Sequence, residues 1–157
     1  MTKEQINEYT LRISQANRSQ IVVILYDMAI QYIDDAKEAI KNGDHECLKI
    51  CCGNAGRVVS DLIGALDDSY ELAVALRQCY IYIQSQISMA VIKNSQEMLM
   101  IAEKMLKKLK ESFEKVAQED NTKPLMSNTE SVYAGFTYGK RAVYDSLTTE
   151  VSRGYKV

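Results

Sequence analysis

The residues best suited to chemistry gather in one short stretch, HECLKICC, which begins at the only histidine of the chain, His45. Three thiols follow, at Cys47, Cys51 and Cys52, and thiolates with an imidazole are ligands of tetrahedral zinc sites. The spacing does not fit such a site, because the chain contains no C-x-x-C pair. We therefore predict no metal site and interpret these cysteines as small buried hydrophobic residues.

His45 could instead accept a phosphoryl group, as in histidine phosphotransfer domains, which are also four-helix bundles. Such a domain needs an exposed imidazole in mid-helix, with a lysine three residues later and a glycine after the lysine. Here Lys49 lies four residues after His45, Ile50 follows it, and His45 falls in the first turn of its predicted helix. A phosphotransfer-like signalling bundle stays an alternative, which transfer from a phosphorylated receiver domain would test.

No other pattern indicates an enzyme. A di-iron bundle needs a Glu-x-x-His motif, which the sequence lacks. A hydrolase needs a nucleophile and a base held together, and a single histidine in a helix turn has no such partners. We predict a protein without catalytic residues and without a cofactor.

Composition and charge narrow the class further. A chain of 157 residues is the size of one domain, and its net charge of -2 argues against a nucleic-acid partner. The lysines from Lys104 to Lys115 alternate with glutamates, which is typical of a solvated helix face. Four cysteines and an N-terminus, MTKEQINEYT, without the apolar stretch of a signal peptide predict a cytoplasmic protein.

Hydrophobic periodicity predicts four long helices, at residues 18–42, 45–66, 70–93 and 95–117. Asn17 and Gln20 form a capping box before the first helix, and Asp44 can cap the second. Gly53 and Gly56 weaken the second helix by ~1 kcal/mol each relative to alanine, so we expect a close backbone approach or a kink there.

Short connections between helices of this length place neighbours antiparallel. The predicted fold is therefore all-α, an antiparallel up-and-down four-helix bundle with a short N-terminal arm and a C-terminal tail. The arm and bundle occupy residues 1–117, and residues 118–157 form a linker and the tail.

The third predicted helix is apolar on too many sides. Successive helical residues lie about 100° apart, which predicts a core seam with Tyr80 and Tyr82 on its two flanks. The seam consists of Leu72, Leu76, Cys79, Ile83 and Ala90.

The outward side of this helix should be charged, but it carries Val74, Ile81 and Ile92 among glutamines and serines. Arg77 is the only charged residue between Leu72 and Ile92. The polar residues make a membrane span unfavourable. Something must therefore cover this side: a segment of the same chain, a second copy or a partner protein.

At this point the sequence resembles the flagellar export chaperones of the FliS type. The first helix carries ILYDMAIQYIDDAKEAIKNGD, similar to that family's Leu-Tyr-Asp/Glu, amphipathic helix and Gly-Asp stop. The stretch DLIGALDDSYELAVALRQCYIYIQSQISMAVIKNS is similar to its Leu-Asp, Tyr-Glu-(Ile/Leu)-Ala, Tyr-x-Tyr and Ile-Lys-Asn, in that order. The resemblance covers about residues 7 to 117.

This resemblance implies a cytoplasmic chaperone that binds the disordered C-terminal segment of flagellin, prevents premature polymerisation and delivers the subunit to the flagellar export gate. The uncharged side of the third helix is the expected groove. The predicted partner-binding residues are Val74, Tyr80, Ile81, Tyr82, Gln84, Ser88 and Ile92. The alternative is a purely structural bundle that covers this helix by forming a homodimer in the absence of a partner.

The chain departs from the family pattern at several places. Asn17-Arg18 replaces the usual Ser-Pro, Phe113 replaces a tryptophan and Ala90-Val91 replaces Ala-Asn. The resemblance also leaves residues 119–157 unexplained.

Two flanking segments are candidates for covering the groove. The N-terminal segment, which has no long hydrophobic period, could act as an arm through Tyr9, Leu11 and Ile13. In the tail, Val143, Leu147 and Val151 recur every four residues, enough for a short amphipathic helix that takes the place of flagellin.

Overall fold

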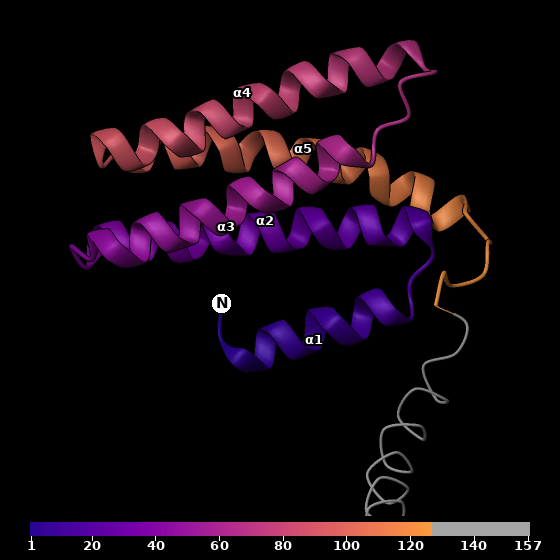
Figure 1. Cartoon of the computed structure of the whole chain (residues 1–157), viewed down its shortest axis with the longest axis horizontal. Helices are drawn as coiled ribbons and strands as arrows, with labels where there is room; N and C mark the ends of the chain where they lie inside the picture. Colours follow the sequence, from indigo (N-terminus) through magenta and orange to yellow (C-terminus); the bar gives the residue numbers. More distant parts are fainter. Residues whose placement is uncertain (127–157) are drawn as a thin grey trace, which may run out of the picture. The chain divides into compact units, whose positions relative to one another are not determined.

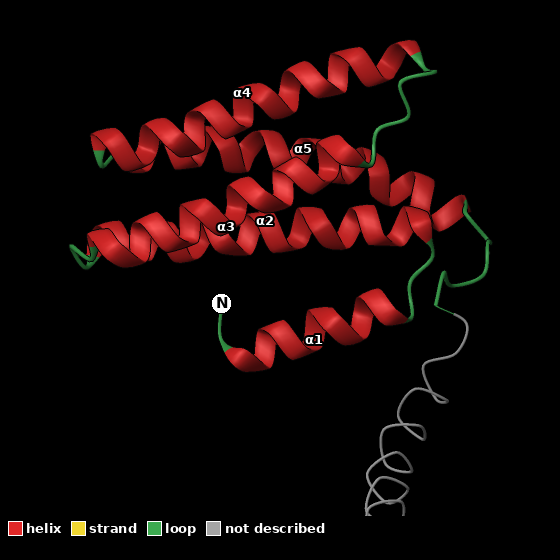
Figure 2. Cartoon of the chain, in the orientation of Figure 1, coloured by secondary structure: helices red, strands yellow, loops and turns green. Residues whose placement is uncertain are grey.

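The computed structural model describes residues 1–126, which form five α-helices and no β-strand (Figure 1; Figure 2). The helices are α1, Lys3–Ser14; α2, Arg18–Lys41; α3, His45–Gly64; α4, Glu71–Lys93; and α5, Gln96–Glu119. The predicted tail residues Val143, Leu147 and Val151 lie outside the described residues.

Helices α2 to α5 begin and end within two residues of the four helices that the sequence predicts. Helix α1 is the one that hydrophobic periodicity did not predict. It begins at a capping box, in which the Gln5 backbone N–H donates to Thr2 Oγ1 at 3.3 Å and the Thr2 N–H donates to Gln5 Oε1 at 2.8 Å. No residue of α1 is buried, so only capping and surface contacts hold it.

Each of the helices α2 to α5 packs against two of the other three. Helix α2 packs against α3 and α5, α4 packs against the same two helices, and α1 packs on α2. Large apolar side chains from α2 to α5 fill the space between them, and each one removed from water stabilises the fold by about 1.5–3 kcal/mol. The largest buried side chains are Tyr26, Ile33, Leu48, Leu62, Tyr80, Ile83, Leu99 and Leu106.

The ends of the helices follow from local sequence. The Gln20 backbone N–H donates to Asn17 Oδ1 at 2.9 Å, and the Asp44 side chain accepts from the Cys47 N–H at 2.9 Å. Gly43 follows α2 at a φ of 69°, and Asn94 ends α4 at a φ of 50°. Both residue types tolerate this left-handed conformation better than others, which explains why the helices stop there.

The segment after α5 is bound to the start of α2. The buried Asn17 side chain donates from Nδ2 to the backbone oxygens of Asp120 at 3.0 Å and Thr122 at 3.3 Å. The Leu125 N–H donates to the Ala16 carbonyl at 3.2 Å. The first compact unit therefore extends over Met1–Leu125, and Met126–Val157 form the second.

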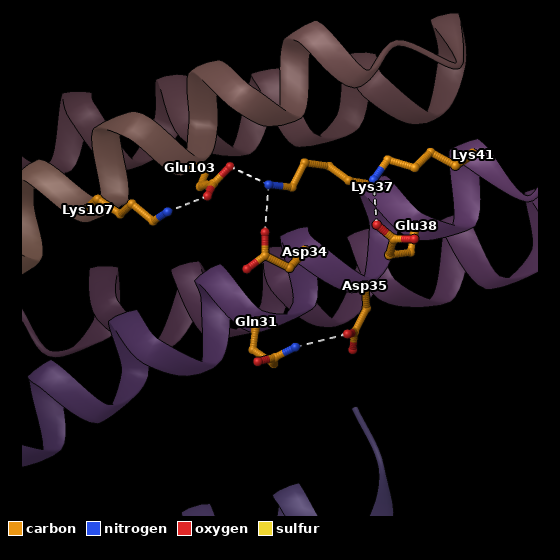
Figure 3. Close-up of polar contacts among 8 residues, drawn as sticks. All are labelled: Gln31, Asp34, Asp35, Lys37, Glu38, Lys41, Glu103 and Lys107. Carbon is orange, nitrogen blue, oxygen red and sulfur yellow. Dashed lines mark hydrogen bonds and ion pairs between the residues drawn. The ribbon is translucent and has the colours of Figure 1, made fainter.

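A cluster of charged residues joins α2 to α5 (Figure 3). Lys37 Nζ lies 2.6 Å from Glu103 Oε2 on α5 and 2.6 Å from Asp34 Oδ1 on its own helix. Burial alone would raise the pKa of Glu103, but hydrogen bonds from Lys107 and Lys37 outweigh it and hold that pKa below its ordinary value. The cluster fixes the two helices against each other without a buried unpaired charge.

Candidate binding surface on helix α4

The buried side of α4 differs from the predicted core seam. It consists of Ala73, Tyr80, Ile83, Ile87 and Ala90. Leu72, the expected start of the seam, is 67% exposed, and Leu76 and Cys79 are only partly buried. The helix is thus rotated toward Tyr80 and Ile87 relative to the prediction.

Tyr80 is a core residue, which corrects its place among the predicted partner-binding residues. Its side chain is 1% exposed, and its hydroxyl lies 2.5 Å from the hydroxyl of Tyr26 on α2. The Tyr26 ring also packs on Phe113, with ring centroids 5.5 Å apart. Phe113, the position where the family has a tryptophan, therefore contributes to the same aromatic cluster.

The outward side of α4 carries exposed apolar residues. Val74 is 57% exposed, Ile81 is 54% exposed and Ile92 is 76% exposed, and all three fall within about 20° of one another around the helix. Tyr82 is also exposed, at 48%. Together with Gln84 and Ser88, these residues are called the α4 surface below.

A groove between α3 and α4 borders this surface on one side. Gln84 Nε2 donates across it to Ser60 Oγ at 2.8 Å and to the Gly56 carbonyl at 3.2 Å. From α3 the lining includes Gly53, Gly56 and Ser60, and from α4 it includes Gln84, Ser88 and Ile92. The lining also includes the apolar residues Ile87 and Val91, so the groove combines apolar surface with the neutral hydrogen-bonding groups of Ser60, Gln84 and Ser88.

The two glycines of α3 do not serve a close backbone approach, which was one of the two explanations that the sequence offered. A Cβ added at Gly53 or at Gly56 would meet no atom within 4 Å. The helix continues through both positions, from His45 to Gly64. Their missing side chains therefore leave open space in the wall of the groove.

The α4 surface is almost free of charge. Arg77, the only charged residue between Leu72 and Ile92, forms an ion pair with Asp68 in the loop before α4. Lys49 and Arg57 lie along the α3 side of the groove. A partner that covers the α4 surface would therefore desolvate few ions, and the energetic penalty of burial would stay small.

The histidine and cysteine stretch shows no constellation for catalysis in the structure. His45 is the exposed first residue of α3, directly after the N-cap residue Asp44. Cys51 and Cys52 are buried, and burial raises the pKa of the Cys52 thiol to about 11. Such a thiol is a poor nucleophile at neutral pH. Within residues 1–126, no group of three or more His, Cys, Asp or Glu side chains could hold a metal ion.

Helix α1 does not cover the α4 surface, so the predicted role of Tyr9, Leu11 and Ile13 as a cover for that surface is corrected. It packs on α2 and lies away from α4 in Figure 1. Leu11 is exposed, whereas Tyr9 and Ile13 are half-buried.

The contacts of the N-terminal segment with α2 include two ion pairs. Arg12 Nη2 lies 2.7 Å from Asp27 Oδ2, and the Met1 amino group forms an ion pair with Asp35. Asp27 also accepts from Lys110 of α5 at 2.6 Å, so one carboxylate connects three helices.

The arrangement suits binding rather than catalysis. An exposed apolar stripe beside a groove that is neutral on its α4 side and carries Lys49 and Arg57 on its α3 side can accept the apolar face of an amphipathic helix. No helix within residues 1–126 has the length and hydropathy that crossing a membrane requires.

Comparison with known proteins agrees with the resemblance drawn from the sequence. A model of the family described as flagellar protein FliS matches residues 2–120, a range that holds all five helices. No curated protein matches the chain. Since the family match covers most of the sequence, the chain belongs to the FliS family of flagellar proteins.

Proposed function

We propose that this chain is a cytoplasmic chaperone of flagellar export that binds the C-terminal segment of flagellin. It keeps that segment from polymerising too early and delivers the subunit to the flagellar export gate. Membership of a flagellar chaperone family supports the role. The observation that carries the proposal is the exposed, nearly uncharged α4 surface, which no described segment of the chain covers.

We further propose that α2 to α5 form an antiparallel up-and-down four-helix bundle. The connections between these helices are short, and each of the four packs on two of the others. This arrangement leaves the outer side of every helix open, which is why an uncharged outer side on α4 points to a partner.

The proposed mechanism is coupled folding and binding. The flagellin segment is disordered when free and becomes helical as its apolar face covers Val74, Ile81 and Ile92. Burial of apolar area contributes about 25 cal/mol per Å² and must exceed the conformational entropy that the segment loses. Chaperoning then follows from occupancy, because the covered face is no longer available for contacts between flagellin subunits.

The polar residues of the surface serve adaptable recognition. Ser88 is exposed, and its hydroxyl can donate to or accept from a helix laid along the groove. Gln84 is already held by Ser60 and Gly56, so it contacts the partner from a fixed position. Neutral groups of this kind bind without the desolvation penalty of an ion.

The substitution Ile81→Glu tests the proposed site. A charge at the centre of the α4 surface should abolish binding of a flagellin C-terminal peptide, measured by calorimetry, and leave the melting temperature close to that of the native chain. Ile50→Glu is the matched control, because Ile50 is 56% exposed on α3 and does not line the groove. Normal binding by Ile81→Glu would exclude the α4 surface, and an unfolded Ile81→Glu would show that this position is core.

A homodimer is the second candidate, favoured by the same exposed stripe. A second copy of the chain could cover Val74, Ile81 and Ile92 without any client. Light scattering with and without the flagellin peptide separates the two functions. A dimer that the peptide does not dissociate would favour the structural role.

A further inference from the structure

The two walls of the groove between α3 and α4 differ in charge. Helix α3 contributes two cations to the lining, Lys49 and Arg57, and both side chains are exposed. The acidic residues of α3, Glu46 and Asp61, do not line the groove. Helix α4 contributes only uncharged residues, namely Gln84, Ile87, Ser88, Val91 and Ile92. The charge along the groove is therefore positive and lies on its α3 edge.

No carboxylate within residues 1–126 forms an ion pair with either of these two cations. The ion pairs in this range involve other basic groups, namely the Met1 amino group, Arg12, Lys37, Lys41, Arg77, Lys107 and Lys110. Arg57 Nη1 donates to Asn54 Oδ1 at 3.3 Å, and this neutral acceptor leaves the guanidinium charge uncompensated. Lys49 and Arg57 can therefore pair with carboxylates of a bound partner.

We propose that the groove selects a client helix with acidic residues on the edge that faces α3, spaced about seven residues apart. This inference deepens the proposed function and rests on it, because it takes an amphipathic helix as the occupant of the α4 surface. The apolar face of that helix covers Val74, Ile81 and Ile92. Its carboxylates lie against Lys49 and Arg57, so charge complementarity defines the chemistry of the client.

The spacing of the acidic residues follows from the geometry of α3. Lys49 and Arg57 lie eight positions apart, which separates their backbones by about 12 Å along the helix at 1.5 Å per residue. In a partner helix along the groove, residues seven positions apart lie on nearly the same side and about 10.5 Å apart. The long lysine and arginine side chains can span the difference, so two carboxylates can meet both cations at once.

Gly53 lies midway between the two cations, four positions from each. A Cβ added at Gly53 or at Gly56 would meet no atom within 4 Å, so this part of the wall is open. The partner can therefore approach α3 most closely between Lys49 and Arg57, with one cation on each side of the contact. The two cations then reach the same edge of the partner without competing for one carboxylate.

The charge pairs serve selection more than affinity. Both cations are exposed, and exposed ion pairs contribute little because water and salt screen them. We expect the two pairs together to strengthen binding about threefold, so burial of apolar area remains the main contribution. A helix with basic residues on the same edge is repelled, which gives the groove selectivity among amphipathic segments.

The test uses the full chain and designed amphipathic peptides that carry leucines on the face toward α4. The peptides differ only at a pair of positions on one edge, seven residues apart, which hold glutamates, glutamines or lysines. Binding is measured by calorimetry at an ionic strength of about 0.05 M, where screening is weak. The native chain should bind the glutamate peptide about threefold more tightly than the glutamine peptide and should bind the lysine peptide most weakly.

The double variant Lys49→Glu and Arg57→Glu should reverse this order. It should bind the glutamate peptide about tenfold more weakly than the native chain does, and it should prefer the lysine peptide. The matched control is Lys3→Glu with Lys115→Glu, which changes the net charge equally at exposed positions that do not line the groove. The control should keep the preference of the native chain. Both double variants should keep the native melting temperature, because all four side chains are exposed.

Failure of this inference and failure of the proposed function give different results. Equal affinity of the Lys49→Glu, Arg57→Glu variant for the glutamate and lysine peptides overturns the acidic edge, and so does a native chain that does not bind the glutamate peptide. A flagellin C-terminal peptide that binds the native chain and this variant equally well also overturns it, while flagellin remains the client. Charge-dependent binding of the designed peptides without binding of the flagellin peptide supports the acidic edge and excludes flagellin as the client.

Discussion

At the scale of single residues, Gly53 and Gly56 lower the stability of α3, and packing against other helices does not compensate for this loss. Each destabilises the interior of α3 by about 1 kcal/mol relative to alanine, and a methyl group at either position would meet only open space. We therefore assign both to the binding groove, where missing side chains leave room for a client.

The double substitution Gly53→Ala and Gly56→Ala should separate stability from binding. We expect the free energy of unfolding in urea to rise by roughly 1.5–2 kcal/mol, because helix propensity improves without a clash. Affinity for the flagellin peptide should fall about tenfold, the equivalent of 1.4 kcal/mol, as the methyl groups narrow the groove. Gly64→Ala, at the end of α3 outside the lining, is the control that should leave affinity unchanged.

Tyr26 and Tyr80 form a buried pair whose hydroxyl groups satisfy each other. Burial raises the pKa of both side chains, so both stay neutral at all physiological pH values. Tyr80→Phe leaves the Tyr26 hydroxyl without its partner and should lower the free energy of unfolding by about 1–3 kcal/mol.

Adding Tyr26→Phe should recover part of that loss, since neither position then buries an unsatisfied hydroxyl group. Urea unfolding of the two single variants and the double variant gives the coupling between the side chains. Flagellin affinity should not change in any of the three. A loss of binding at unchanged stability would return Tyr80 to the site.

At the scale of elements, α1 is tied to α2 by an ion pair. It buries no residue, and its Arg12 pairs with an Asp27 that also binds Lys110. Asp27→Asn should release α1 from α2, which hydrogen exchange would detect as faster exchange of the α1 amides while the amides of α2 to α5 stay protected.

Asp34→Asn is the control for this release. Asp34 lies on the same helix, but its ion pair is with Lys37 and does not involve α1. Equal protection of α1 in the native chain and in Asp27→Asn would contradict the ionic account and assign the docking to Tyr9 and Ile13 instead.

The same scale shows what the sequence could predict. Capping residues and the hydrophobic period together predict α2 to α5. Asn17, Asp44 and Gly43 can be recognised in the sequence because they set the ends of these helices through local backbone geometry. Helix α1 was missed although Thr2 and Gln5 form a capping box, since a short helix without buried residues shows no clear period.

Within the candidate site, the exposure of Ile81 could be predicted, because this residue points away from the core both on the predicted seam and on the observed buried side of α4. The role of Tyr80 could not. The sequence places the core seam on Leu72, whereas the rotation of α4 toward Tyr80 depends on packing against Tyr26 of α2. The open groove beside Gly53 and Gly56 likewise requires knowledge of how α3 and α4 pack.

At the scale of the whole molecule, the apolar α4 surface and the ionic contacts of α1 predict different responses to salt. Ions screen partly exposed pairs such as Arg12 with Asp27, whereas they do not weaken burial of apolar area. Raising the ionic strength from about 0.05 M to about 0.5 M should therefore increase hydrogen exchange in α1 and leave flagellin affinity within about twofold.

Calorimetry at both salt concentrations measures the affinity, and its temperature dependence should give a negative heat-capacity change of binding because apolar area is buried. Ile81→Glu serves as the reference without an intact surface. Affinity that falls by tenfold or more with salt would show that ion pairs dominate, and the lysine-rich side of α5 would then replace α4 as the surface that holds the client.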